Sequence, residues 1–506
     1  MTQSAALNAA QRRSDLAALA DSVGVDVLVI GGGITGAGIA LDAASRGLSV
    51  VLVDRHDLAF GTSRWSSKLA HGGLRYLASG NLGIARRSSA ERGVLMTRTA
   101  PHLVRAMPQL VPLLPAMKRS QRALVRIGFQ AGDVLRALAG TSSSVLPRPR
   151  RISADAAVAM APTVRRDGLD GALLAYDGQL IDDARLVIAV ARTAAQYGAR
   201  ILPRVSASAA TGSSVRLTDE MTGESLDVAA RVVINATGVW AAEVDPSIRL
   251  RPSRGTHLVL DAATFGNPTA ALTIPIPGET NRFIFALPAQ LGRIYLGLTD
   301  EEAPGPIPDV PEPTAEEVRF LLDTVNTALA TPLTTADVTG AYAGLRPLID
   351  AGEGRTSDLS RDHAVLESDS GMFSVVGGKL TEYRLMAQDV LDRAIPARGL
   401  SAEPCRTGEL PLVGATAGTS QALPASLVAR YGGESAAVVA AARCGRPTDP
   451  VAEGIDVTRA EFEFAVTHEG ALDVEDILDR RTRIGLVAAD REQALRAAEE
   501  FLTEAR

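Results

Sequence analysis

The chain has 506 residues, of which 46% are hydrophobic and 22% charged, and its formal net charge at pH 7 is −6. These values describe a globular protein of roughly two to four domains and exclude a mainly disordered chain. The acidic balance argues against a general nucleic-acid-binding protein. Two cysteines are too few for a disulfide framework or a zinc site, so we expect no metal centre and a reducing, cytoplasmic environment.

Residues 1–20 are expected to form a polar or helical tail. The pair Arg12-Arg13 is a feature of twin-arginine export signals, but Asp15 and Asp21 follow it and no long apolar region does. No stretch of the sequence approaches the ~18 uninterrupted apolar residues of a transmembrane helix.

The first ordered signal is a strand, turn, helix and strand over residues 25–54. An apolar, β-branched run at 25–30 predicts a buried parallel strand, and small residues at 37–46 predict a helix. Between them lies the GxGxxG pattern Gly31-Gly-Gly33-Ile-Thr-Gly36, and a second buried strand at 49–54 ends in Asp54. This order is typical of a dinucleotide-binding unit.

Each residue of this fingerprint has a physical task. Gly31 permits the tight turn, Gly33 lets the backbone approach a pyrophosphate, and Gly36 lets the helix pack against the strand. The helix N-terminus attracts the anion, and the carboxylate of Asp54 can bind ribose hydroxyls.

Residues 62–77 combine hydroxyls, Lys68, His71 and a Gly72-Gly73 pair, which suits a loop around a polar ligand; a Ser/Gly surface turn is the alternative. Residues 83–126 then hold nine basic residues and one acid. Within 118–138, apolar residues recur on one helical face, so the segment 83–138 contains a basic amphipathic helix. Such a helix fits an anionic membrane surface, or a core-packed helix with a solvated basic face.

A later strand, 231–235, ends in Ala-Thr237-Gly238, a small turn typical of the second flavin-contacting strand in FAD oxidoreductases. Strand patterns between 254 and 300 predict an antiparallel substrate sheet at about 251–340. A proline-rich connection at 303–313 leads to a helix at about 315–329, with Thr314 as the N-cap.

Three polar blocks follow, at 340–350, 360–363 and 374–384. They carry Arg346, Arg361 and the sequence Gly377-Gly378-Lys379, which stands at a helix start. Paired guanidiniums suit a phosphate dianion, although a single Arg is more often a surface charge. Residues 397–425 predict a linker, and 426–506 predict a C-terminal helical domain without a redox motif.

These blocks resemble the FAD-dependent glycerol-3-phosphate dehydrogenase family, in its respiratory, quinone-linked, bacterial form. The resemblance runs from about residue 25 to 390 and extends to 469–483. The motifs that carry it are GGGITGAG, Ser66 to Tyr76, Asp182 to Arg185, Asn235 to Gly238, Arg254 to His257, Gly297 to Asp300, Gly344 to Pro347, Arg361 to His363, and Gly377 to Thr381.

The resemblance implies an α/β fold with a Rossmann-like FAD domain of the GR2 type at 21–396, an inserted antiparallel substrate sheet and an all-helical C-terminal domain. It implies oxidation of sn-glycerol 3-phosphate to dihydroxyacetone phosphate by hydride transfer to FAD. His257, Arg346 and Lys379 are the catalytic candidates, with His257 either the base or a residue that positions its neighbours. The substrate-binding candidates are Arg346, Arg361, His257, Tyr76 and Arg75.

The same resemblance assigns the cofactor to residues of every glycine-rich block. The candidates are Gly31, Gly33, Gly36, Asp54, Ser63, Ser67, Lys68, His71, Gly72, Thr237, Gly238, Gly378, Lys379, Leu380 and Thr381.

The expected partners are glycerol 3-phosphate, a membrane quinone and an anionic membrane surface, with no nucleic acid and with a homodimer as one candidate assembly. The expected location is cytoplasmic, peripheral to the inner face of the cell membrane. The alternatives are an oxygen-reducing flavin oxidase of the glycerol-3-phosphate or amino-acid type, and a membrane-surface protein that keeps FAD as a structural element. Lysine is rare in this chain (Lys68, Lys118 and Lys379 against 49 arginines), so we expect Lys68 and Lys379 to face FAD or substrate as compact ammonium groups.

Overall fold

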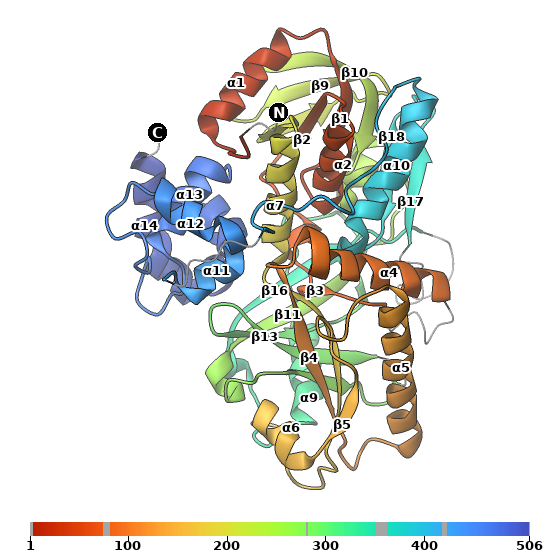
Figure 1. Ribbon diagram of the computed structural model, residues 1–506, viewed down its shortest axis with the longest axis vertical. Coiled ribbons are helices and arrows are strands. Elements are labelled where there is room, and N and C mark those ends of the chain that lie inside the picture. The colour runs from red at the N-terminus through yellow and green to blue at the C-terminus, as the bar shows by residue number, and fades with distance from the viewer. Residues whose placement is uncertain (1–3, 74–80, 280–281, 351–361, 417–421, 505–506) are drawn as a thin grey trace.

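Two β-sheets and a group of C-terminal helices make up the molecule (Figure 1). The computed structural model describes residues 4–73, 81–279, 282–350, 362–416 and 422–504. The first sheet lies at the top of the view, the second below it, and the C-terminal helices lie to the left of both. The expected α/β class, with a second sheet and a helical C-terminal part, is confirmed.

The first sheet is built on the predicted strand–turn–helix–strand unit. Its main path is mostly parallel, with only the edge strand β17 antiparallel, and β8 and β9 extend it through β10. The order is β17 (His363–Glu367), β18 (Phe373–Gly377), β10 (Ser225–Asn235), β1 (Val25–Ile30), β2 (Val50–Asp54) and β7 (Arg200–Pro203), with β8 (Val205–Ser208) and β9 (Ser214–Asp219).

Both faces of this sheet are covered. Helices α2 (Ile34–Ser45), α7 (Asp183–Gln196) and α10 (Tyr383–Ala397) pack on one face, and α1 (Ala9–Ala20) with the β8–β9 ladder packs on the other. In β1, Val27 and Val29 face the helices while Leu28 and Ile30 face the opposite core. Burial on both sides explains why the strand reads as a continuous apolar run.

The N-terminal segment is helical, but its described part is not a free tail. The Asn8 side chain caps α1 by accepting a hydrogen bond from the Gln11 N–H. Arg12 is buried, where it pairs with Asp219 and donates to the Pro203 carbonyl at 2.7 Å. Arg12, the first of the two arginines, thus holds α1 to the β7–β9 region.

The second sheet has ten strands and is mostly antiparallel, with a parallel pair between β12 and β4. Helices α6 (Ala154–Met160) and α9 (Ala315–Asn326) contribute to the core on one of its faces, and Thr314 caps α9 as expected. The order is β15 (Glu301–Glu302), β11 (Ser253–Asp261), β14 (Arg293–Gly297), β13 (Phe283–Ala289), β12 (Ala271–Pro275), β4 (Val104–Pro112), β6 (Ala172–Leu180) and β3 (Leu69–Ala70), with β16 (Val338–Arg346) on β11 and β5 (Arg150–Ile152) on β6.

One expectation about this region needs correction. The sheet is not confined to about 251–340, because β3 to β6 join it from earlier in the chain. The segment 83–138 contains the expected amphipathic helix at its end, after other elements. It contains α4 (Leu82–Val94), a π-helical turn η2 (Leu95–Thr99), the largely buried strand β4, and only then α5 (Arg119–Leu138). Two prolines in β4 hide its strand pattern.

The C-terminal part is helical from residue 425 onward, and 398–416 and 422–424 contain no helix or strand. Its elements are α11 (Ala425–Tyr431), η8 (Gly432–Glu434), α12 (Ser435–Ala441), α13 (Arg459–His468), the π-helical turn η9 (Asp476–Arg481), η10 (Ile484–Leu486) and α14 (Ala488–Glu504). Within the described ranges, no helix is long and apolar enough to cross a membrane. The remaining short elements are η1 (Thr62–Arg64), η3 (Gly238–Trp240), α8 (Ala241–Val244), η4 (Ala262–Phe265), η5 (Thr335–Asp337) and η7 (Leu380–Glu382).

Candidate active site

A cavity of about 960 Å³ runs from the carboxyl ends of β1, β2 and β10 across one face of the second sheet. Its wall includes the glycine turn after β1, the loop 60–73, the end of β16 and the start of η7. Segments far apart in the sequence therefore meet at one site. Crevices at the carboxyl ends of parallel strands are the usual place for ligands in such sheets.

The glycine turn has the close packing that its pattern requires. Gly31 has a φ of +112°, and a Cβ there would lie 2.6 Å from the Ala236 carbonyl oxygen. A Cβ on Gly36 would lie 1.8 Å from the Gly31 carbonyl oxygen, so this glycine serves helix packing and does not line the cavity. Gly33 does line it and is the N-cap of α2; the Ile34 N–H donates to Ser63 Oγ, and Thr35 of the same first turn also lines the cavity, where an anion is favoured.

Asp54 stands at the end of β2 and forms part of the cavity wall. Its carboxylate accepts hydrogen bonds from the backbone N–H groups of Gly32 at 2.6 Å and His56 at 2.7 Å. Burial raises the pKa of Asp54 to about 6, against the opposing effect of these two hydrogen bonds. Its place at the end of β2 on the cavity wall is the one that a ribose-binding carboxylate requires.

The second expected flavin strand, β10, lies directly beside β1. The Ala236 N–H donates to the Ile30 carbonyl at 2.8 Å, and Asn235 Oδ1 accepts from the backbone N–H and hydroxyl of Thr237. Thr237 and Gly238 line the cavity beside the glycine turn.

The loop 60–73 is divided between the cavity and the interior. Ser63, Ser67 and His71 line the cavity, and Ser63 Oγ accepts from the Ile34 N–H at 2.9 Å. Gly72 does not line it. A Cβ there would lie 2.0 Å from the Arg92 guanidinium, so this glycine makes room for a buried arginine rather than for a ligand.

Lys68 is also placed differently from expectation. Its side chain is 1% exposed, and its ammonium donates to Asp183 at 2.9 Å and to the carbonyls of Arg64 and Ser66. It lies 4.7 Å from the centre of the Tyr342 ring. Burial lowers its pKa to about 8, partly offset by Asp183. Lys68 therefore supports the loop from behind and is not part of the described cavity wall.

His257 comes from β11, is 1% exposed and lines the cavity. Its Nε2 is 2.9 Å from Ser67 Oγ, and its ring stacks on Tyr342 with 4.8 Å between centroids. Its Nδ1 has no hydrogen-bond partner among the described residues. Burial, followed by the charges of Lys68 and Arg346, lowers its pKa well below the usual value, so the ring is neutral at working pH.

Arg346 ends β16 and points into the cavity from the edge next to β11. Its guanidinium donates to Ser253 Oγ, Asp300 Oδ1 and the Thr299 carbonyl, each at 3.2 Å. Asp300 forms an ion pair with it at 3.2 Å, and the same cavity contains Lys379. The side chain remains 20% exposed, which leaves a surface for an anionic ligand.

Lys379 precedes η7, and its ammonium donates to Ser88 at 2.7 Å and lies 3.2 Å from Glu382 Oε1. The side chain is 15% exposed and lines the cavity together with Gly378, Leu380 and Thr381. The structure thus places the 374–384 block at the cavity, whereas Arg75, Tyr76 and Arg361 lie outside the described residues.

Several cavity residues have no recognisable sequence signal. Asp177 on β6 accepts hydrogen bonds from Arg92 at 2.7 Å and from the Gly72 N–H at 3.1 Å, and its Oδ2 lies 3.1 Å from His71 Nδ1. Gln109 on β4 and Thr273 on β12 are buried at the cavity, and Gln109 Nε2 and Thr273 Oγ1 lack partners in the described structure. Only the pairing of distant strands brings these side chains together.

The site fits FAD. Gly31 and Gly33 line the cavity without side chains, so a ligand can approach their backbone. The N-terminus of α2 suits a pyrophosphate, and the carboxylate of Asp54 suits a ribose. Thr237, beside the turn, and the Gly378–Thr381 segment also line the cavity. No group of three or more His, Cys, Asp or Glu residues in the described ranges is arranged to hold a metal ion.

The fold and this cleft define an FAD-dependent oxidoreductase, and the family model with the description FAD dependent oxidoreductase matches residues 26–384. A second model, the C-terminal domain of alpha-glycerophosphate oxidase, matches residues 405–505. Glycerol-3-phosphate dehydrogenase 1 of Mycobacterium tuberculosis is 72% identical over 513 residues and 99% of each chain. The chain therefore belongs to the FAD-dependent glycerol-3-phosphate dehydrogenase family.

More distant relatives agree. The mitochondrial glycerol-3-phosphate dehydrogenase of Bos taurus is 34% identical over 97% of this chain and 71% of its own length. The crystal structure of the Bacillus halodurans glycerol-3-phosphate dehydrogenase complexed with FAD is 28% identical, covers 97% of this chain and 94% of its own, and superposes with a TM-score of 0.73. The L-alpha-glycerophosphate oxidase of Mycoplasma pneumoniae shares the fold, with a TM-score of 0.57 at 17% identity over 77% of this chain and 98% of its own.

Proposed function

We propose that the protein oxidises sn-glycerol 3-phosphate to dihydroxyacetone phosphate, with the electrons passing through FAD to a membrane quinone. The observation that carries the proposal is the meeting of His257, Arg346 and Lys379 in the same cavity as the dinucleotide turn. The neutral His257 suits the hydroxyl group of an alcohol, and the cations Arg346 and Lys379 suit a phosphate dianion on the same molecule. When bound, FAD supplies the hydride acceptor.

The cations bind and orient the substrate. Arg346 is held by Ser253, Asp300 and Thr299, so its guanidinium meets an anion with little loss of side-chain freedom. Lys379, held by Ser88 and Glu382, adds a point charge. The family resemblance also assigns Arg361, Arg75 and Tyr76 to substrate binding.

His257 takes the hydroxyl proton. We place Nε2 on the substrate side of the ring, because it lies 2.9 Å from Oγ of the cavity residue Ser67, whereas Nδ1 is fully buried. A neutral ring can accept the proton, and the phosphate dianion offsets the positive charge that then forms beside Arg346. The Tyr342 stack fixes the plane of the ring.

The acceptor side of the proposal rests on the apolar branch of the cavity. Leu124, Ile127 and Phe129 of α5 line it together with Phe283 and Phe285 of β13. Leu124 and Ile127 are also 45% and 65% exposed at the surface. An apolar ring compound can thus approach the cleft from the face of α5.

The membrane part rests on the outer face of α5. Val134 and Leu138 are 58% and 72% exposed, and the cations Lys118, Arg119 and Arg126 are exposed near its start. This combination fits a helix that lies in the plane of an anionic membrane, on its cytoplasmic side. Peripheral binding gives the enzyme access to an acceptor that resides in the bilayer.

Anaerobic mixing tests the proposed substrate. The holoenzyme is mixed with glycerol 3-phosphate, glycerol, glycine or lactate, and the flavin absorbance is followed. We expect bleaching with glycerol 3-phosphate alone; bleaching only by glycine or lactate would refute the substrate. Rapid peroxide release in air, at the rate supported by a quinone, would favour the oxidase alternative.

A further inference from the structure

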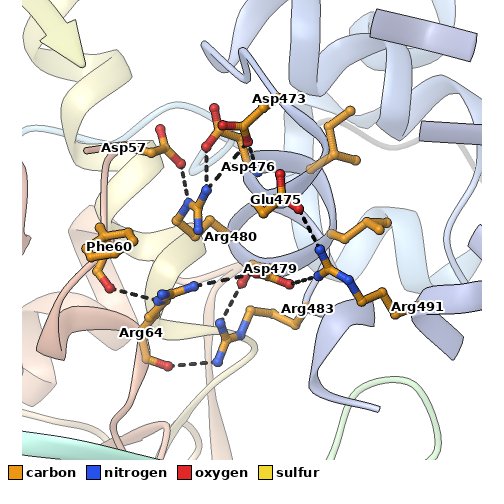
Figure 2. A network of polar contacts seen from close by, with 12 residues as sticks. Asp57, Phe60, Arg64, Asp473, Glu475, Asp476, Asp479, Arg480, Arg483 and Arg491 are labelled. Atoms are coloured by element: carbon orange, nitrogen blue, oxygen red, sulfur yellow. Dashed lines mark hydrogen bonds and ion pairs between the residues drawn. The ribbon is translucent and has the colours of Figure 1, made fainter. Parts of the chain in front are cut away.

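A short segment of the C-terminal domain, from η9 to η10, reaches into the catalytic part of the chain (Figure 2). Its side chains Arg480, Arg481 and Arg483 are each at most 2% exposed. Figure 2 shows two of them directed at the loop that runs from Asp57 to Arg64. This loop begins three residues after the ribose-binding candidate Asp54 and leads directly to the cavity residues Trp65 to Ser67.

The first anchor of the loop is Asp57, which is fully buried. Its carboxylate accepts hydrogen bonds from Arg480 Nε at 2.6 Å and from both terminal nitrogens of Arg481 at 2.7 and 2.9 Å. Burial alone would raise the pKa of Asp57, but the charges of Arg481 and Arg480 outweigh it and hold the pKa well below its usual value. Two residues further on, the Ala59 N–H donates to the Gly32 carbonyl in the nucleotide turn at 3.0 Å.

The second anchor is the Arg64 carbonyl. It accepts hydrogen bonds from Arg483 and from Lys68, each at 2.8 Å, and the Arg483 guanidinium lies 5.1 Å from the centre of the Trp65 ring. Ser67, three residues after this carbonyl, contacts His257. Arg483 is therefore linked to the expected base through the backbone of residues 64–67 and the contact between Ser67 and His257.

The segment is fixed to the second sheet as well. Arg293 of β14 donates to the backbone carbonyls of Arg483 at 2.7 Å and Ile484 at 3.1 Å. One stretch of the C-terminal domain thus bonds both the loop that lines the nucleotide end of the cavity and the sheet that carries His257.

Burying several arginines close together costs desolvation and repulsion energy, so stability alone does not explain this arrangement. Arg64, Arg480 and Arg483 crowd together, and burial followed by the charges of the other two lowers the pKa of Arg64 to about 9. Buried ion pairs are often no more stabilising than apolar side chains of the same volume, but they fix geometry. The network is therefore better explained by a requirement for one loop position.

We propose that Arg480, Arg481 and Arg483 are positioning residues for the active site. Through them the C-terminal domain holds the loop 57–67 against the nucleotide turn and against His257.

A matched pair of substitutions separates positioning from stability. Arg483→Gln removes the donor to Arg64, and the control Arg430→Gln breaks the equally buried Arg430–Glu461 pair inside the C-terminal domain. Thermal unfolding is measured for both, to compare their losses of stability. The site is probed without turnover by acrylamide quenching of Trp65 in a Trp240→Phe background.

We expect Arg483→Gln to make Trp65 at least about twice as quenchable and to slow anaerobic flavin bleaching at saturating substrate about tenfold or more. Arg430→Gln should change neither, and Arg483→Lys, which can still donate to the Arg64 carbonyl, should recover most of both. Equal quenching and equal bleaching rates for the Gln variants would overturn the proposal. If Arg483→Gln does not fold, Arg481→Lys replaces it. This substitution keeps a positive charge beside Asp57 and removes one of the two hydrogen bonds that Arg481 donates to the Asp57 carboxylate.

The bleaching arm rests on the proposed function, whereas the quenching arm does not. If glycerol 3-phosphate fails to bleach the wild-type enzyme, the proposed substrate falls and the Trp65 comparison still decides the positioning role.

Discussion

Lys68 and Lys379 show how one residue type serves two purposes in the same site. Both stand in glycine-rich blocks, and both were expected to face a ligand because lysine is so rare here. Lys379 lines the cavity, but Lys68 points away from it toward Asp183 and two carbonyls. The sequence motif predicted the position of the loop. The direction of the Lys68 side chain, however, is set by the buried carboxylate of Asp183 on α7, which lies 115 residues later in the chain.

At Arg346 we predict a loss of substrate binding without a loss of cofactor. Arg346→Ala removes charge-assisted hydrogen bonds worth about 2 kcal/mol or more, which corresponds to a KM for glycerol 3-phosphate raised roughly 30-fold. Steady-state kinetics and the flavin content measure the two effects. The control is Arg319→Ala, an exposed arginine on α9 outside the cavity; an unchanged KM in Arg346→Ala would remove Arg346 from the substrate site.

At Asp54 we predict a pH dependence of FAD binding. The raised pKa of about 6 means that the carboxylate becomes protonated as pH falls through that value, and only the ionised form accepts two ribose hydroxyls. FAD affinity should therefore be constant above about pH 7 and should fall below pH 6, by at most about tenfold per pH unit. Titration of the apoprotein measures this; Asp54→Asn should bind more weakly and show a flat profile, and a profile equal to that of the wild type would contradict the assignment.

Elements with local signals could be predicted, and elements that depend on distant pairing could not. The strand–turn–helix–strand unit, the capped helix α9 and the amphipathic helix α5 each follow from patterns within about 30 residues. Strands β4 and β6 lacked such a pattern, and only their pairing with each other and with β12 reveals Gln109 and Asp177 as site residues. The contact between Gly72 and Arg92 could not be predicted either, because Arg92 is held there by Asp177 of β6.

For α5 we predict that charge on its outer face abolishes membrane binding. Val134→Glu with Leu138→Glu places two acids among exposed apolar side chains that do not line the cavity. Wild-type protein should co-sediment with anionic vesicles at low salt and dissociate at high salt, whereas the double variant should remain in solution. The control is Met221→Glu, an equally exposed position outside α5; vesicle binding by the double variant would contradict the role of this face.

At the scale of the whole molecule, carboxylates hold the C-terminal domain to the catalytic part. Asp57 pairs with Arg480 and Arg481, and Glu469 pairs with Arg185 of α7 at 2.8 Å. Burial would raise the pKa of Glu469, but Arg185 and Arg192 outweigh it and lower the pKa. Both acids are thus ionised in the folded state at lower pH than in the unfolded chain.

This linkage predicts acid sensitivity. Groups with depressed pKa values stabilise the fold above their unfolded values, near pH 4, and the contribution is lost as pH falls further. We expect stability at pH 7 to exceed that at pH 3.5 in the wild type, and Asp57→Asn to cost about 3 kcal/mol at pH 7 and less at pH 3.5. Denaturant unfolding at both pH values checks this, and an equal cost at the two values would contradict the ionised state of Asp57.

The central claim is that this cavity moves a hydride from glycerol 3-phosphate to FAD. The most direct measurement is an anaerobic single turnover in which bleached flavin and dihydroxyacetone phosphate are quantified together. The account predicts one product molecule for each flavin bleached, and slower bleaching when the substrate carries deuterium at its second carbon. Bleaching without dihydroxyacetone phosphate, or no bleaching by a holoenzyme that another donor reduces, would contradict it.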